Sequence, residues 1–321
     1  KIMTTYKEIF GKPVKVLSSD PSNETEGQVW YNSSSGTFKA GISSGAWASG
    51  TSMNIIRRVG GGAGTQSSAL VFTGAGGPPT KLSSSEEWNG SSWTGGGAVG
   101  TARYFLGSCG TQTAALGFAG YNGGNKFEVE EYDGSSWSEV NNIPYSVRDL
   151  KGFGIQTAAV AAGGYSGTAV IATTTNYDGT NWTSSGNMGT ARSALSASGT
   201  QTAGLISGGQ SPPNTTATEE YDGSSWTTGG NLSSGRSQVS MVGLQTSSLI
   251  FGGSPGTLTL TEEYDGTSWT VKSTLGTARK DIQSAGLSTS ALAAGGNDGS
   301  NTISTTENFN VTLATKTLTS S

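Results

Sequence analysis

The sequence predicts an all-β fold, a β-propeller of four-stranded blades, because three features repeat along it: a Trp, a Gly-Gly pair and an Asp-Gly turn. The evenly spaced tryptophans are Trp93, Trp137, Trp182, Trp226 and Trp269. They lie 44, 45, 44 and 43 residues apart, a typical length for a propeller repeat. This regularity outweighs a composition of 51 Gly and 33% hydrophobic residues, which alone would suggest a disordered chain.

Each unit contains four candidate strands in sequence. In one unit, the segments 192–198, 202–207 and 215–221 have short β-compatible patterns. The dipeptide Asp222-Gly223 then predicts a hairpin into a fourth strand that contains Trp226. Every unit keeps the second glycine of the pair, Gly209 in this unit, so we expect a positive φ or a close backbone approach there.

An arginine opens each unit, ten or eleven residues after the preceding Trp. These arginines are Arg57, Arg103, Arg148, Arg192, Arg236 and Arg279. We expect each to pair through both guanidinium nitrogens with the second Glu of a Glu-Glu pair in a nearby blade, a Glu that Asn176 and Asn308 replace in two units. The alternative is a ring of arginines in a central channel that binds an anion.

Closure of the ring depends on the two ends of the repeat region. The last unit lacks its own fourth strand, because Ala314 occupies the place of its Trp, while Trp47 belongs to a fourth-strand pattern without a blade. If the two complete each other, six blades form without an open sheet edge. The alternatives are a fourth strand from 311–321, or a seventh blade to which a hairpin at 28–39 contributes.

The predicted domain organisation has three parts. Residues 1–27 depart from the repeat and form an N-terminal docking arm, residues 28–46 form a hairpin or entry segment, and residues 47–321 form the propeller. The apolar side chains Tyr6, Ile9 and Phe10 of the arm either dock onto another protein or run along the propeller flank.

The residue content disfavours enzyme activity, a metal and a cofactor. The chain contains no His, which removes the usual general base, the Ser-His-Asp triad and the imidazole ligands of zinc and copper. Glu-Glu pairs recur once in most units, and adjacent strand residues point to opposite faces, so these pairs do not resemble a glycosidase pair. The enzymatic alternative is a polysaccharide hydrolase that uses Asp149, Asp281 or Asp298.

The net charge and the hydropathy pattern disfavour two kinds of partner, nucleic acid and the membrane interior. A net charge of −4 and 18 scattered basic residues leave no cationic stripe, so nucleic acid is not expected as a partner. No apolar stretch is long enough to predict membrane insertion. The single Cys109 lies in an apolar strand pattern and is expected to be a small buried group.

The loops between the second and third strands differ from unit to unit. Variable loops on a constant scaffold favour recognition. The candidate binding residues, expected to stack on sugars or to form hydrogen bonds with them, are Tyr121, Asn122, Asn125, Tyr165 and Asn297. The alternative for each is an ordinary polar hairpin loop.

The order Gly-Gly, Tyr, Trp and Arg with this spacing resembles the kelch repeat over about residues 47–310. The repeated segment Gly-Thr-Gln-Thr-Ala at 110–114 and 199–203, and the segment at 26–39, resemble kelch-type structural proteins of marine tailed bacteriophages. The first resemblance implies a kelch-like propeller, but propellers of this kind have several functions.

The phage resemblance implies a virion location, as a tail appendage or fibre component that adheres to a glycan on the bacterial surface. Other virion proteins would then be partners through the N-terminal arm, and a homo-oligomer is compatible with that role. The alternative within the same setting is a capsid or tail scaffold or decoration protein without a ligand.

Overall fold

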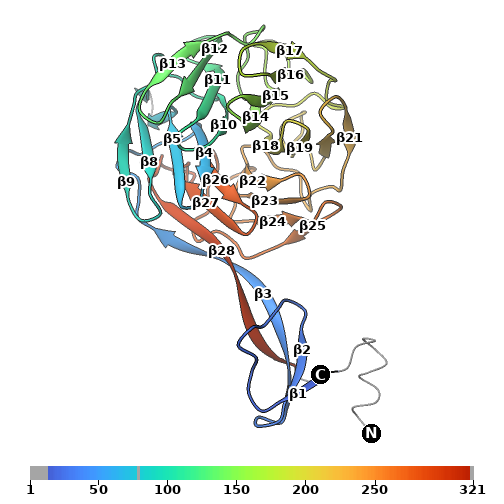
Figure 1. Cartoon of the computed structure of the whole chain (residues 1–321). Helices are drawn as coiled ribbons and strands as arrows, with labels where there is room; N and C mark the ends of the chain where they lie inside the picture. Colours follow the sequence, from blue (N-terminus) through green and yellow to red (C-terminus); the bar gives the residue numbers. More distant parts are fainter. Residues whose placement is uncertain (1–13, 78–79, 319–321) are drawn as a thin grey trace. The chain divides into compact units, whose positions relative to one another are not determined.

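The computed structural model describes residues 14–77 and 80–318, and these residues contain strands and no helix (Figure 1). No helix long and apolar enough to cross a membrane therefore occurs among them. The contacts divide the chain into two compact units, one from residues 1–46 and 310–321, the other Trp47–Phe309. The predicted boundary at Trp47 coincides with this division, whereas residues 310–321, which we had assigned to the propeller, group with the first unit.

The unit Trp47–Phe309 contains five four-stranded antiparallel sheets in sequence order. The first consists of β4 (Gly61–Thr65), β5 (Ser68–Phe72), β8 (Ser85–Trp88) and β9 (Trp93–Gly96). The second consists of β10 (Gly107–Gly110), β11 (Ala115–Tyr121), β12 (Asn125–Tyr132) and β13 (Trp137–Val140). The third consists of β14 (Lys151–Ile155), β15 (Ala158–Ala162), β16 (Thr174–Tyr177) and β17 (Trp182–Ser184).

The fourth sheet consists of β18 (Ser196–Thr200), β19 (Ala203–Ser207), β20 (Thr218–Tyr221) and β21 (Trp226–Thr228). The fifth consists of β22 (Ser240–Leu244), β23 (Ser247–Phe251), β24 (Thr261–Tyr264) and β25 (Trp269–Val271). The short strands β6 (Ala75–Gly77) and β7 (Thr80–Lys81) pair with each other. Figure 1 shows the sheets of this unit following one another around a common centre, which is consistent with a β-propeller.

The last sheet of this unit is completed from the start of the chain. Its strand order is β26 (Gln283–Leu287), β27 (Ser290–Ala294), β28 (Thr306–Leu318) and β3 (Thr37–Gly50). The ring of Trp47 lies 4.8 Å from that of Phe251 and 5.3 Å from that of Phe309. The expected exchange therefore occurs, and residues 311–318 continue β28 instead of forming a fourth strand.

The other unit contains two short strands and the first part of β3. Strand β1 (Lys15–Leu17) pairs parallel with β2 (Val29–Asn32), which forms an antiparallel hairpin with β3 at the predicted place. Asp20 accepts hydrogen bonds from Lys39 Nζ at 2.7 Å, Asn32 Nδ2 at 2.8 Å and Trp30 Nε1 at 3.1 Å. These bonds lower the pKa of Asp20 to about 2. Residues 1–13 of the predicted docking arm lie outside the described residues.

The repeated tryptophans connect neighbouring sheets. The indoles of Trp137, Trp182 and Trp226 pack on an aromatic ring of the preceding sheet, for example Trp137 on Phe72 with centroids 4.5 Å apart. All but one of the repeated tryptophans also donate from Nε1 to a hydroxyl on the third strand of the preceding sheet, as Trp269 does to Thr218 Oγ1 at 3.0 Å. In one sheet Val129 occupies the hydroxyl position, and Trp182 Nε1 has no partner among the described residues.

The glutamine of the Gly-Thr-Gln-Thr segment is a second connection, which the sequence reasoning did not interpret. Gln201 Nε2 donates to the backbone oxygens of Ala159 at 3.1 Å and Tyr177 at 2.7 Å, both in the preceding sheet. The equivalent glutamines are Gln66, Gln112, Gln156 and Gln245. One side chain thus satisfies two carbonyl oxygens between adjacent sheets.

The first strand of each sheet starts later than predicted, because the residue two positions after the repeat arginine has a positive φ. In the fourth sheet the strand begins at Ser196 instead of 192, since Ala194 has φ 49°. The equivalent residues are Val59, Phe105, Asp149, Gln238 and Asp281, with φ between 52° and 60°. The chain therefore turns sharply before it enters the innermost strand.

These six residues form a closed ring of backbone hydrogen bonds. Each N–H donates to the carbonyl oxygen of the equivalent residue in the preceding unit, with N···O distances from 2.8 to 3.0 Å. The ring closes where Val59 N–H donates to the carbonyl of Asp281 at 3.0 Å. The turn thus satisfies backbone groups that would otherwise be unpaired at the centre of the unit.

Candidate functional site

Five repeat arginines form buried ion pairs within their own units. The pairs are Arg57–Glu86, Arg103–Glu130, Arg192–Glu219, Arg236–Glu262 and Arg279–Glu307, with N···O distances from 2.5 to 3.2 Å. The arginine side chains are fully buried. Each carboxylate also accepts a backbone N–H from the loop before the arginine, as Glu219 does from Gly189 at 2.6 Å. An arginine ring open to the channel is therefore wrong for these five residues.

The prediction that the second Glu forms the pair is also wrong. The first Glu pairs with the arginine, and the second faces the opposite side of the strand, as the alternation of strand residues requires. There Glu87 accepts from Tyr132 Oη at 2.5 Å, and Glu220 accepts from Tyr264 Oη at 2.6 Å. Burial and these contacts raise the pKa of both phenols to about 12.

Arg148 does not occupy the repeat position to which we had assigned it. Counting back from the positive-φ residue Asp149 places the fully buried Val147 at that position. The position of the first Glu in this unit is held by Thr175. Both members of the buried ion pair are thus replaced by uncharged residues, and Arg148 lies one position later in the repeat.

At its actual position, Arg148 stacks between two of the predicted sugar-binding residues. Its guanidinium carbon lies 4.7 Å from the ring centroid of Tyr121 and 5.0 Å from that of Tyr165. Its Nε lies 3.6 Å from a carboxylate oxygen of Asp149. Neither phenol oxygen forms a hydrogen bond with another of the residues that the structure describes, so each keeps a donor and an acceptor.

The position after the repeat arginine directly precedes the positive-φ residue of the backbone ring in every unit. Its residues, in unit order, are Arg58, Tyr104, Arg148, Ser193, Ser237 and Lys280. Each is bridged to a residue after the second glycine, for example Tyr104 to Tyr121 and Arg148 to Tyr165. Four consecutive units of the cycle therefore carry large cationic or aromatic side chains, and the other two carry serine. We call these six positions the rim.

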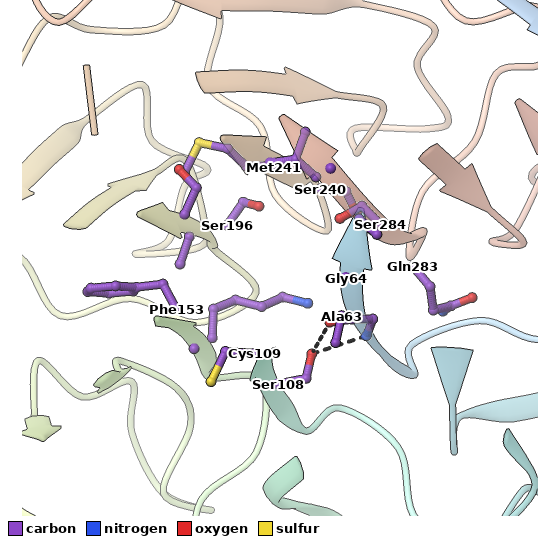
Figure 2. A pocket seen from close by; sticks show the side chains of 18 of the residues that line it. Ala63, Gly64, Ser108, Cys109, Phe153, Ser196, Ser240, Met241, Gln283 and Ser284 are labelled. Atoms are coloured by element: carbon purple, nitrogen blue, oxygen red, sulfur yellow. Dashed lines mark hydrogen bonds between the residues drawn. The ribbon is translucent and has the colours of Figure 1, made fainter. Parts of the chain in front are cut away.

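Two cavities that share lining residues lie among the innermost strands and the backbone ring. A channel cavity of about 150 Å³ is lined by the innermost strands, and Figure 2 shows Ser108, Cys109, Ser196 and Ser240 around it. Small residues are required, because a Cβ on Gly62 would lie 2.5 Å from the carbonyl oxygen of Ser284. Ser108 Oγ accepts a hydrogen bond from the Gly62 N–H and donates one to the Gly62 carbonyl oxygen, both at 3.1 Å. Burial raises the pKa of the Cys109 thiol to about 12, so this thiol is unreactive.

A second cavity of about 30 Å³ lies at the backbone ring and shares Lys151 and Ile282 with the channel cavity. Asp149 and Asp281, two of the three residues considered for hydrolysis, line it together. Burial raises the pKa of Asp149 to about 6, and burial also raises the pKa of Asp281. A cavity of this volume accommodates a water molecule, not a sugar ring.

The third hydrolase candidate lies elsewhere. Asp298 accepts the backbone N–H groups of Ser300 at 2.9 Å and Asn301 at 2.7 Å within its own loop. These bonds lower the pKa of its carboxyl group. It does not line the cavity that contains Asp149 and Asp281, so the structure does not assemble the three acids into one site.

The predicted asparagines have roles within or between loops. Asn125 Nδ2 donates to the carbonyl oxygen of Tyr165 at 2.9 Å, which holds two neighbouring loops together. Asn297 Oδ1 accepts the N–H of Gly299 at 3.0 Å, and the carbonyl oxygen of Asn122 accepts from Lys81 Nζ at 2.5 Å. These asparagines therefore stabilise the loops, whereas the two predicted tyrosines contact Arg148.

Sequence reasoning missed Tyr104, Lys280 and Lys151 near the central opening. The first two share the rim position, so an alignment based on the residue after the repeat arginine would have found them. Comparison with protein-family models and with curated proteins finds no match for this chain.

Proposed function

We propose that the unit Trp47–Phe309 is a six-bladed, kelch-like β-propeller that acts as a non-enzymatic binding module. The six-membered backbone ring and the completion of the last sheet by β3 support the blade number. The order of glycine pair, tyrosine, tryptophan and arginine supports the likeness to kelch repeats. The binding face in this proposal is the rim with its adjoining tyrosines.

The stack of Arg148 between Tyr121 and Tyr165 carries the proposal that this face binds a glycan. Aromatic rings with free hydroxyls offer a stacking surface and hydrogen bonds, the two contacts that a sugar ring uses. Arg148 is partly exposed, so the stack does not require a fully buried charge. Tyr104 extends the surface, since its ring lies 5.6 Å from that of Tyr121.

Binding of the isolated protein to an array of bacterial surface polysaccharides tests this proposal. We expect saturable binding without release of reducing ends, and a loss of about tenfold or more when Tyr121 and Tyr165 are both replaced by Ala. Phe127→Ala is the matched control, because this exposed aromatic residue lies outside the stack. Binding that survives the double substitution would exclude this face, and product release would favour a hydrolase.

We also propose that the protein is a virion component, in a tail appendage or fibre. The support is the resemblance of the repeats and of residues 26–39 to phage structural proteins. Electron microscopy of antibody-labelled particles tests it. Label on distal appendages is the expected result, label on the capsid or tail body would favour a scaffold without a ligand, and unlabelled particles would contradict a virion location.

A further inference from the structure

A pocket of about 390 Å³ lies at the rim beside the aromatic stack. Its lining includes Arg58, Lys81, Lys280 and Asp281, together with the rings of Tyr104 and Phe105. It shares Val59, Phe105, Gln238 and Asp281 with the cavity at the backbone ring. The volume is within the range of small-ligand sites and accommodates a sugar unit. We call it the rim pocket.

The distribution of basic residues distinguishes this pocket from the rest of the unit. Among the described residues of Trp47–Phe309, eight basic side chains lie within 4 Å of a carboxylate oxygen. The four that form no ion pair are Arg58, Lys81, Lys151 and Lys280. Three of these line the rim pocket, and Lys151 lines the cavity next to it. In a chain of net charge −4, three basic residues beside the single carboxylate of Asp281 are a local excess of positive charge.

The donors in the pocket are positioned and available. Backbone bonds of 3.0 and 2.9 Å to Ala75 hold Arg58, and its Nε is buried without a partner among the described residues. Lys81 Nζ donates one bond to the carbonyl of Asn122, which leaves two N–H groups for another acceptor. Backbone bonds of 3.0 and 2.9 Å to Asn297 hold Lys280 in the same way.

Asp281 is the acidic group in the lining, and its carboxyl group interacts electrostatically with Lys280, Arg58 and Lys151. Gln238 Nε2 donates to Asp281 Oδ1 at 3.0 Å, which holds the carboxylate toward the backbone ring. The lining also contains Tyr104 and Phe105, whose ring centroids lie 4.9 Å apart in an edge arrangement. The pocket therefore combines cationic donors with aromatic residues, the two kinds of group that contact an acidic sugar.

We propose that the rim pocket binds the carboxylate or sulfate group of an acidic saccharide, while the tyrosines around Arg148 contact neighbouring sugar units. This inference rests on the proposed glycan-binding function and specifies its ligand class. A carboxylate and a sulfate ester present the same anionic oxygens to Arg58, Lys81 and Lys280, so the choice between them belongs to the experiment.

The test measures binding of the full chain by calorimetry to three hexasaccharides: oligogalacturonate, a sulfated galactan fragment and neutral maltohexaose. We expect at least one acidic probe to bind about tenfold tighter than the neutral probe, and added salt to weaken that binding. Lys280→Gln should weaken binding of the acidic probe by about tenfold, because it deletes one charged donor. Lys272→Gln is the matched control, since Lys272 pairs with Glu263 on the fifth sheet.

The outcomes separate the two proposals. Preference for one acidic probe identifies the group, and equal preference for both supports a general anion pocket. Equal affinity for the neutral probe, with no effect of Lys280→Gln, would overturn the acidic ligand but leave glycan binding intact. If maltohexaose and both acidic probes fail to bind, and the polysaccharide array is also negative, both proposals fail.

Discussion

At the scale of single residues, one valine breaks a pattern that every other repeated tryptophan follows. Val129 occupies the hydroxyl position in the second sheet, and Trp182 Nε1 consequently has no described partner. A buried indole N–H without an acceptor costs about 1–3 kcal/mol. The equivalent pair of Trp269 with Thr218 shows the satisfied state.

Val129→Thr should therefore stabilise the protein by about 1 kcal/mol, because it supplies the missing acceptor. Thr218→Val, the reciprocal change, should destabilise it by about 1–2 kcal/mol by leaving Trp269 unpaired. Equilibrium unfolding in urea measures both. A loss of stability in the first variant would show that the new hydroxyl does not reach the indole.

Asp149 should make stability depend on pH. Its pKa is raised from 3.8 to about 6 in the folded protein, mainly by burial. The unfolded chain therefore binds fewer protons between these values, and the contribution of Asp149 to stability, present below pH 3.8, is lost as the pH rises through 6.

Asp149→Asn should remove this dependence and stabilise the protein at pH 7 by up to about 3 kcal/mol, with little effect at pH 3.5. Urea unfolding at the two pH values measures the difference. Equal effects at both values would mean that Asp149 titrates normally in the folded protein.

At the scale of the repeat, one unit has replaced its buried ion pair by Val147 and Thr175. Removing one member of a buried ion pair leaves the other charge uncompensated. Replacing both members by uncharged residues is often tolerated. The molecule thus contains its own example of a joint replacement, next to five intact pairs.

Glu262→Thr should destabilise the protein by about 3–5 kcal/mol, since Arg236 would remain buried and unpaired. Adding Arg236→Val reproduces the third unit and should recover at least half of the loss, about 2 kcal/mol. Thermal unfolding of the two single variants and the double variant measures the coupling. Additive losses would show that the third unit tolerates its substitutions for a local reason.

The elements of the repeat were largely predictable, and the exceptions have physical causes. Trp spacing, the Asp-Gly hairpins and the exchange of Trp47 depend on side-chain identity, which the sequence displays directly. The late start of the innermost strand depends on a positive φ at residues such as Ala194 and Phe105, which have no residue preference for it. The prediction placed Arg148 at the repeat-arginine position, one residue too early in the repeat. The residue at that position is Val147, an uncharged side chain that the search for a repeated arginine could not detect.

The same limit applies to the candidate site. Tyr121 and Tyr165 were found from variable loops, but their convergence on Arg148 is set by backbone bridges between segments far apart in sequence. The unpaired state of Arg58 and Lys280 depends on which carboxylates the arginines of the repeat already use. Neither property is local in sequence.

At the scale of the whole molecule, sheet closure makes the stability of the unit Trp47–Phe309 collective. Trp47 contacts Phe251, Phe309 and the hydroxyl of Thr261, so it links the last two sheets. Trp47→Ala should cost about 3–5 kcal/mol and open the edge of β28. Hydrogen exchange should then accelerate in all six sheets together. Acceleration restricted to the last sheet would show that the sheets unfold independently.

The backbone ring has an electrostatic consequence for the rim. Its six N–H to C=O vectors run head to tail around a closed path, so their components along that path sum to zero. A helix end, in contrast, imposes a fixed partial charge on whatever lies before it. No helix occurs among the described residues, so charged side chains are the main source of potential at the opening. Exchange of rim residues can change the ligand's preferred sign of charge while the polypeptide scaffold remains electrically neutral beneath them.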